Sequence, residues 1–139
     1  GASMLIRARV FDAIGPFDDR FFLYFEETDF CRRALAAGWT TYYVPASQVM
    51  HIGSVSTGMK VPQRRMPSYW FDSRAHYFRK HHGRAYLWLT DLLWIASFAS
   101  WRLRRWVQRK PDDDRPRLLT DFVVAMLRRV RATPRLRSS

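Results

Sequence analysis

The chain has few of the residues on which disulfide-linked and metal-stabilised proteins depend. It contains one cysteine, Cys31, which excludes a framework of internal disulfides and favours a reducing compartment, with the thiol buried. Three of its four histidines, His76, His81 and His82, fall in one segment, but no thiol or carboxylate accompanies them at the spacing of a zinc site. We therefore expect these histidines to lie at a solvated helix end.

The chain also lacks a continuous apolar run long enough to cross a membrane. Such a span needs about 20 residues, whereas the most apolar segment, 86–110, carries Asp91 in its interior and arginines near its end. Its tryptophans and leucines recur at helical spacing, with Thr90, Ser97 and Gln108 on another side. The pattern predicts an amphipathic helix, either packed on the rest of the protein or lying in the interface of an anionic membrane.

Acidic residues are half as numerous as basic ones. The chain has 12 aspartates and glutamates against 24 lysines and arginines, a formal net charge of +12. Residues 1–60 hold six bases and six acids, so the whole excess lies in residues 61–139. A surface of this charge attracts polyanions, which indicates an anionic membrane or a nucleic acid as a partner.

Three of the acids stand together between an aromatic run and a predicted helix. The segment FFLYFEETDFCRRALAAGW places Glu26, Glu27 and Asp29 at that junction. Thr28 is the expected N-cap of the helix, and Gly38 is its expected C-terminal stop. Glu26 and Glu27 would then lie just before a helix N-terminus, where the helix dipole favours ionised carboxylates. Such a pair suits a general base or a metal ligand; the alternative is that it only caps the helix.

Seven short motifs follow one another in a fixed order around these acids. They are Gly-Ala at 1–2, Met-Leu-Ile-Arg at 4–7, Ile-Gly-x-Phe-Asp at 14–18, Phe-Phe-Leu-Tyr-Phe-Glu-Glu at 21–27, Ala-Gly-Trp at 37–39, Val-Pro-Ala at 44–46 and His-x-Gly-x-x-Ser-Thr at 51–57. In this order they resemble the second half of the catalytic domain of family 2 glycosyltransferases, and the bacterial rhamnosyltransferase-like branch most closely. The resemblance implies an α/β fold: the C-terminal part of the mixed sheet of an A-type glycosyltransferase fold, followed by a mainly helical extension.

The resemblance also implies roles for the acids. In such enzymes one carboxylate takes the proton of the acceptor hydroxyl while the nucleotide diphosphate leaves from the other face of the sugar, which inverts the anomeric centre. The matching carboxylate is Glu27, where many relatives carry aspartate, and a base fixed at a helix start meets the need for hydrogen-bond reach. Glu26 is expected to orient the loop or the acceptor, and Asp29 to support the helix N-terminus.

Further site residues follow from the same resemblance. Apolar residues at 42–44 and 49–50 predict a short strand just before His51. His51 matches a histidine that helps to hold a divalent metal, Mg²⁺ or Mn²⁺, against the leaving diphosphate, and Ser56 and Thr57 lie in the loop expected over the phosphates. Gly1 and Ala2 belong to the acceptor side. Taken alone, His51 is also compatible with a hydrogen-bonded surface residue, and Ser56 and Thr57 with a simple turn.

The nucleotide-binding half of the resembled fold has no counterpart in the sequence. That half carries an Asp-x-Asp metal motif, and none precedes Gly1. The resemblance therefore predicts the C-terminal part of a longer enzyme, which on its own binds its donor poorly and is inactive.

Residues 61–139 are predicted to be helical. One helix begins at about Ser68 and ends near Gly83, the amphipathic helix follows over 86–110, and a third covers about 118–131 after a linker. The predicted units are 1–60, the acceptor-side half of a catalytic domain; 61–110, an aromatic and basic extension; and 111–139, a linker and basic helix.

Two functions fit these features. The first is inverting transfer of a sugar, rhamnose in the resembled branch, from a nucleotide-sugar donor to a lipid-linked or polysaccharide acceptor of the cell envelope. Trp70 and Arg74 add an aromatic and basic surface for the acceptor, and the enzyme is expected at the cytoplasmic face of the membrane as a peripheral protein. The second is a basic module that binds nucleic acid or anionic membrane without catalysis. Because the excess of bases lies outside the half with the motifs, we favour the first and expect no nucleic-acid partner.

Overall fold

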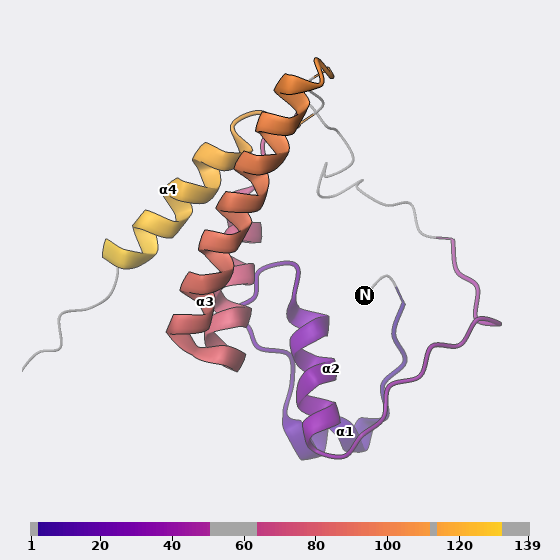
Figure 1. Cartoon of the computed structure of the whole chain (residues 1–139). Coiled ribbons are helices and arrows are strands. Elements are labelled where there is room, and N and C mark those ends of the chain that lie inside the picture. Colours follow the sequence, from indigo (N-terminus) through magenta and orange to yellow (C-terminus); the bar gives the residue numbers. More distant parts are fainter. Residues whose placement is uncertain (1–2, 51–63, 112–113, 132–139) are drawn as a thin grey trace, which may run out of the picture.

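The part of the chain that the structure describes folds into four helices that form two packed pairs (Figure 1). The computed structural model describes residues 3–50, 64–111 and 114–131. In chain order the helices are α1 (Ala8–Ile14), α2 (Glu26–Ala36), α3 (Ser68–Val107) and α4 (Leu118–Arg131). Within the described ranges there is no strand, so the predicted part of a mixed sheet is not confirmed, whereas the predicted excess of helices over strands is.

Helix α3 is a hairpin of two helical segments. Gly83 has φ 85° and ψ 177°, a conformation that only glycine adopts readily and that interrupts the helix. The side chain of Arg74 contacts that of Asp91, 17 residues later, which a straight helix would place about 25 Å away. Segments 68–82 and 84–107 therefore run back along each other, as Figure 1 shows, and the predicted helix end near Gly83 is confirmed.

Helix α4 packs on both segments of this hairpin. The Phe122 ring is 1% exposed, and its centroid lies 5.9 Å from that of Phe71 and 4.1 Å from that of Trp94. In the same interface Arg129 donates to Asp91 at 2.7 Å. The bounds Leu118–Arg131 agree with the predicted helix, and part of the apolar stripe of each helix serves as core, as one alternative predicted.

Helices α1 and α2 share a second core. It consists of Val10, Phe30 and Ala34, with Ile6, Phe11, Ile14 and Trp39 packed against it. Helix α2 is stopped by Gly38, as predicted: its φ of 84° allows the Gly38 N–H to reach the Leu35 carbonyl at 3.0 Å and the Trp39 N–H to reach the Ala34 carbonyl at 2.9 Å. Cys31 on α2 is only partly buried, so the prediction of a buried thiol is wrong.

Residues 40–50 follow α2 as an irregular, exposed segment. Tyr43 is 90% exposed and Met50 is 93% exposed. The strands predicted at 42–44 and 49–50 are wrong in this structure, because a strand needs a neighbour for its backbone hydrogen bonds and no other described segment is paired with this one.

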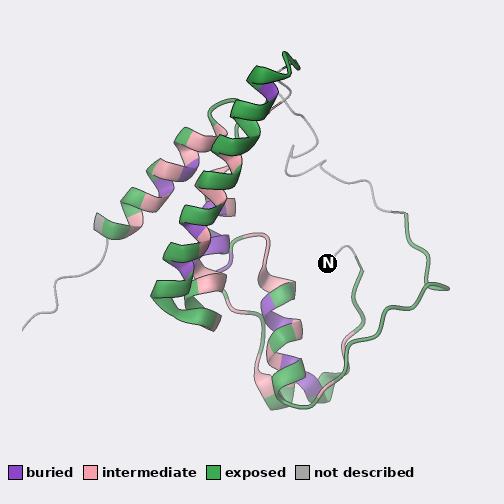
Figure 2. Ribbon diagram, in the orientation of Figure 1, coloured by how far each residue is buried: buried purple, intermediate pink, exposed green. Residues whose placement is uncertain are grey.

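Burial follows the sides on which the helices meet (Figure 2). Among the largest side chains that are almost completely buried, two are acids: Asp29 on α2 and Asp91 on α3. A buried carboxylate requires cationic partners. These partners define the candidate site.

Candidate catalytic site

The turn that leads into α2 has an unusual backbone conformation. Tyr24 and Phe25 have φ angles of 69° and 71°, in a region that residues with side chains rarely adopt. The first segment of α3 holds this turn, because the Phe25 ring centroid lies 5.6 Å from that of Tyr77 and Ser73 Oγ donates to the Leu23 carbonyl at 2.9 Å. Such a turn persists only where its surroundings fix it, which is common at functional sites.

The acidic pair lies in the first turn of α2. The helix begins at Glu26, with Phe25 as its N-cap, and the Phe25 carbonyl accepts a hydrogen bond from the Asp29 N–H at 2.8 Å. Thr28 lies inside the helix, so its predicted role as N-cap is wrong. The aromatic contacts of Phe25 fix the helix start earlier than a threonine cap would. Glu26 and Glu27 therefore lie beside the backbone N–H groups of the helix start, where the dipole favours a carboxylate.

The two glutamates lie close enough to affect each other's charge. Burial raises the pKa of Glu26 above its ordinary value, and the charge of Glu27 raises it further. A general base has to be ionised, so the raised pKa of Glu26 makes Glu27 the better candidate of the two.

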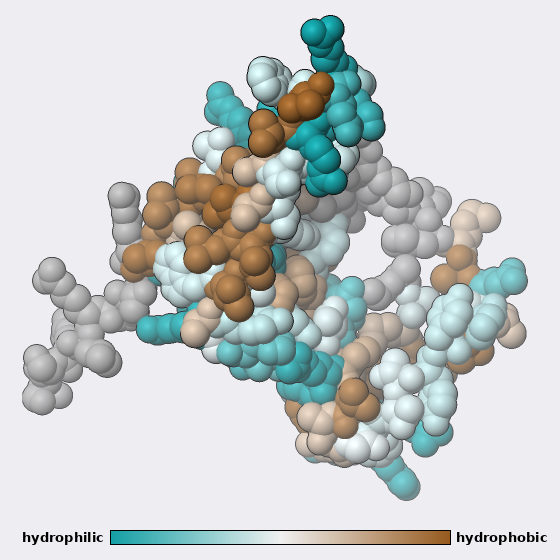
Figure 3. All heavy atoms as spheres, viewed as in Figure 1, coloured by the Kyte–Doolittle hydropathy of each residue, from teal (hydrophilic) through white to brown (hydrophobic). Residues whose placement is uncertain are grey.

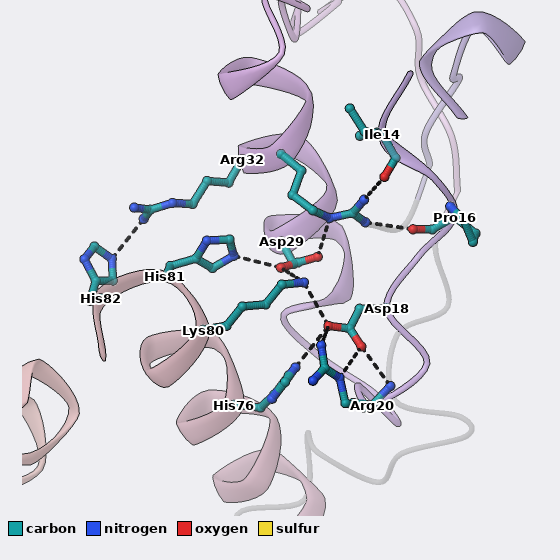
Figure 4. Close-up of polar contacts among 11 residues, drawn as sticks. Ile14, Pro16, Asp18, Arg20, Asp29, Arg32, His76, Lys80, His81 and His82 are labelled. Carbon is teal, nitrogen blue, oxygen red and sulfur yellow. Dashed lines mark hydrogen bonds and ion pairs between the residues drawn. The ribbon is translucent and has the colours of Figure 1, made fainter. Parts of the chain in front are cut away.

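Asp29 fastens the first turn of α2 to α3. Its buried carboxylate accepts from Arg33 Nε at 2.8 Å and His81 Nε2 at 2.7 Å, and it pairs with Lys80 Nζ at 2.6 Å (Figure 4). Arg33 also donates to two backbone carbonyls at the end of α1 and just after it, at 2.6 and 2.8 Å. Burial would raise the pKa of Asp29, but hydrogen bonds from Lys80, Arg33 and His81 bring it below its ordinary value. The helix start is therefore held from two sides.

A second carboxylate, Asp18, shares Lys80 with Asp29. It accepts from Lys80 Nζ at 2.8 Å, from His76 Nε2 at 3.0 Å and from Arg20 Nε at 2.9 Å (Figure 4). The hydrogen bond from Arg20 is the largest cause that lowers the pKa of Asp18 far below its usual range. We refer to these side chains as the Asp18–Asp29 network; they are Asp18, Arg20, Asp29, Arg33, His76, Lys80 and His81.

Two of the three clustered histidines belong to this network. The side chains of His76 and His81 are 11% and 12% exposed and contact Asp18 and Asp29, whereas His82 is exposed. The predicted solvated helix end is therefore wrong for His76 and His81, because acids 58 and 52 residues earlier fold against them. The sequence analysis also missed Lys80. The feature of the sequence that could have pointed to Lys80 is its i, i+4 spacing from His76, which places both side chains on one face of a helix.

The other predicted site residues lie in different places. Trp70 is next to the strained turn, with its ring centroid 6.3 Å from that of Phe25. Arg74 is buried in the α3–α4 interface, where it pairs with Asp91 and lies 5.2 Å from the centre of the Phe122 ring. Predicted residues outside the described ranges are Gly1, Ala2, His51, Ser56 and Thr57.

The described residues do not fit a metal ion. Within 3–50, 64–111 and 114–131, no three histidine, cysteine, aspartate or glutamate side chains form a group able to hold one. Asp18 and Asp29 are each bound by Lys80 and other cationic groups, which a metal would have to displace. A predicted metal site therefore depends on His51, outside these ranges.

Comparison with known proteins decides the family. The model of glycosyl transferase family group 2 matches residues 1–127. The chain belongs to this family. The resemblance to family 2 glycosyltransferases is thereby confirmed, and the pair Glu26–Glu27 lies within the matched residues of this glycosyltransferase.

Named relatives of this glycosyltransferase are rhamnosyltransferases. It is 34% identical over 106 residues to the N-acetylglucosaminyl-diphospho-decaprenol L-rhamnosyltransferase of Mycobacterium tuberculosis, a match that covers 75% of this chain and 30% of that protein. It is 39% identical over 51 residues to rhamnosyltransferase WbbL of Escherichia coli, covering 37% of this chain and 19% of that protein. The chain thus spans less than a third of the length of these relatives. No solved structure matches it.

Proposed function

We propose that Glu27 is the general base of an inverting sugar transfer. The observation that carries this proposal is the position of Glu27 in the first turn of α2, at a helix start with a strained backbone that Asp29 ties to α3. A base must be ionised and must be held within reach of its proton. The dipole at the start of α2 supports the first requirement, and the anchoring of the helix start by Asp29 supports the second.

In the proposed step, the Glu27 carboxylate takes the proton of the acceptor hydroxyl as that oxygen forms a bond to the anomeric carbon. The bond from this carbon to the diphosphate oxygen breaks on the opposite face, and the nucleoside diphosphate leaves with the electron pair. Glu26 Oε2 is buried and has no hydrogen-bond partner in the described part of the chain. A buried oxygen of this kind calls for a partner, and we assign it to orienting the acceptor.

The proposed donor is a nucleotide-activated rhamnose, and the proposed acceptor is a lipid-linked sugar or a growing polysaccharide of the cell envelope. The names of the two relatives support this: both are rhamnosyltransferases, and one is named for N-acetylglucosaminyl-diphospho-decaprenol. The partly exposed Trp70 beside Phe25 offers an aromatic surface for a sugar ring. The proposal keeps Mg²⁺ or Mn²⁺ at His51, the diphosphate at Ser56 and Thr57, and the acceptor side at Gly1 and Ala2.

The enzyme is proposed to act at the cytoplasmic face of the membrane without crossing it. None of the helices in the described ranges is long and apolar enough to span a bilayer. Apolar side chains nevertheless gather on the surface over α3 and α4 (Figure 3). Those exposed on the second segment of α3 include Trp88, Leu89, Leu92, Leu93, Trp101, Leu103 and Trp106. Tryptophans on one side with arginines near the end are typical of a helix that lies in the interface of an anionic membrane.

A second candidate function is binding of nucleic acid without catalysis. The excess of basic residues over 61–139 favours it, since this charge attracts any polyanion. It does not account for the paired glutamates at a strained helix start. We therefore place it second.

Transfer of labelled rhamnose tests the proposed function. In an active transferase that contains this chain, label from a nucleotide-rhamnose donor should appear on a lipid-linked N-acetylglucosaminyl diphosphate, and Glu27→Gln should remove most of the transfer. Asp12→Asn is the matched control, because Asp12 is exposed on α1 away from the network. Transfer that is equally fast in Glu27→Gln would contradict the proposal. Failure with every lipid-linked and polysaccharide acceptor would overturn the proposed substrates.

A further inference from the structure

A pocket of about 390 Å³ lies where the two segments of α3 meet α4. Arg79 comes from the first segment, Arg84 and Trp88 from the second, and Arg129 and Val130 from α4. The volume falls in the range of small-molecule sites, about 300–1,000 Å³. The pocket therefore has the size of a ligand site and walls from all three helical segments.

The arginines of the pocket differ in whether they pair with an acid of the protein. Asp91, one of its two acids, is bound by Arg74 and by Arg129, the latter at 2.7 Å. By contrast, Arg79 and Arg84 are exposed and make no hydrogen bond or ion pair in the described part of the chain. Their guanidinium donors are open to a ligand, and the planar fork of a guanidinium matches the oxygens of a phosphate.

The hairpin of α3 brings these two arginines to one pocket. Gly83, which breaks the helix with φ 85°, lies between Arg79 and Arg84 in the sequence. The pocket receives one guanidinium from each side of that break. The second acid that lines the pocket is Asp72, on the first segment.

Apolar side chains also line the pocket, and an exposed apolar surface continues outside it. Trp88 is 42% exposed and Val130 is 48% exposed. The neighbouring Leu89 and Leu92 on α3 are also more than half exposed and belong to the apolar surface in Figure 3. A ligand that fills the pocket therefore meets both arginines and apolar side chains.

We propose that this pocket binds a phosphate or diphosphate carried on a hydrocarbon chain. The arginines would hold the phosphate oxygens, and Trp88, Val130 and the adjoining leucines would cover the first part of the chain. In the working enzyme the ligand is the diphosphate of the lipid-linked acceptor; this assignment, though not the binding itself, rests on the proposed function. The same chemistry occurs in ordinary phospholipids, so the test has to separate the two sources.

Calorimetric titration of the full chain with farnesyl diphosphate, below its micellar concentration, tests the inference. We expect farnesyl diphosphate to bind. Inorganic diphosphate, which lacks the hydrocarbon chain, and farnesol, which lacks the phosphates, should each bind about tenfold or more weakly. Short-chain phosphatidylglycerol should also bind about tenfold more weakly. Equal affinity for this phospholipid would overturn the assignment to the acceptor.

Paired variants locate the binding. The double variant Arg79→Gln, Arg84→Gln should bind farnesyl diphosphate about tenfold or more weakly than the wild type. The control is Arg7→Gln with Arg9→Gln, which removes the same charge from exposed positions around the start of α1 and should leave the affinity unchanged. Trp88→Ala should weaken the binding of farnesyl diphosphate but not that of inorganic diphosphate. Circular dichroism reports whether each variant keeps its helices.

Two results would overturn the inference. One is unchanged affinity in a folded Arg79→Gln, Arg84→Gln variant. The other is no binding of farnesyl diphosphate by the folded wild-type chain. In the second case the proposed function would still stand if Glu27→Gln abolished sugar transfer, so the two failures are distinguishable.

Discussion

At the scale of single residues, two buried aspartates organise the molecule. Asp29 ties the start of α2 to α3, and Asp91 ties both segments of α3 to α4 through Arg74 and Arg129. Removing a carboxylate from water is unfavourable unless cations and hydrogen bonds replace the water. Both acids have such partners. The contacts therefore fix which helix faces meet, more than they add to stability.

The pKa values of Asp18 and Asp29 predict how the protein responds to low pH. The hydrogen bond from Arg20 lowers the pKa of Asp18, and hydrogen bonds from Lys80 and its neighbours lower that of Asp29 against the effect of burial. A lowered pKa gives a contribution to stability that is full above the unfolded value of about 3.9 and is lost as the pH falls through the folded value. The melting temperature should therefore fall steeply below about pH 4.

Asp29→Asn tests this origin of acid sensitivity. At about pH 6 the variant should lose about 1–3 kcal/mol of unfolding free energy, because charged hydrogen bonds are replaced by neutral ones. Its melting temperature should then decline less than that of the wild type between about pH 4 and pH 2. Asp12→Asn, an exposed acid, is the control and should behave as wild type. Equal declines in Asp29→Asn and wild type would exclude Asp29 as a source.

The sequence singles out candidate residues only where the signal is local. It points to Glu26 and Glu27 because an aromatic run, a helix start and the surrounding motifs all lie within a short stretch. Lys80 and His81 were missed as partners of the acids, because they contact residues 51 to 62 positions earlier and spacing along the chain does not record such contacts.

At the scale of helices, Gly83 determines the shape of the C-terminal half. Its φ of 85° and ψ of 177° allow the antiparallel hairpin, and an added Cβ would meet no atom within 4 Å. Strain in the backbone is then the only penalty expected. Gly83→Ala should lower the unfolding free energy by about 1–3 kcal/mol, measured by chemical denaturation. Ser100→Ala, at an exposed position of the same helix, is the control. If Gly83→Ala were as stable as this control, the break would not depend on glycine.

Helices were more predictable than strands for a physical reason. The start of α3 at Ser68 and both ends of α4 agree with the predictions, because helical periodicity and Gly and Pro signals are encoded in neighbouring residues. A strand at 42–44 requires hydrogen bonds from a second strand that can lie anywhere in a protein. Among the described residues it has no such partner, and the segment stays irregular.

At the scale of the whole molecule, the exposed apolar surface of α3 predicts membrane binding. The full chain should bind vesicles that contain phosphatidylglycerol, with a blue shift of tryptophan emission, and should bind neutral vesicles more weakly. Each arginine near the surface contributes about 1 kcal/mol, and burial of apolar area contributes a part that salt does not remove.

Two double variants distinguish membrane binding through this surface from non-specific binding by other exposed apolar side chains. Leu103→Ser with Trp106→Ser should reduce vesicle binding, because both side chains are more than half exposed on α3. Tyr42→Ser with Tyr43→Ser, which changes exposed side chains after α2, should not. Binding that vanishes at high salt without a blue shift would refute peripheral attachment. Strong competition by duplex DNA would favour the nucleic-acid function.

The central claim, that Glu27 is the base, is tested most directly by single-turnover rates of Glu27→Gln and Glu26→Gln in an active transferase containing this chain, at saturating donor and acceptor. Glutamine keeps the size of the side chain and removes proton acceptance. The account predicts a fall of about 10²–10⁴ for Glu27→Gln with donor binding preserved, and a smaller fall for Glu26→Gln. A near-normal rate for Glu27→Gln together with a large loss for Glu26→Gln would contradict it.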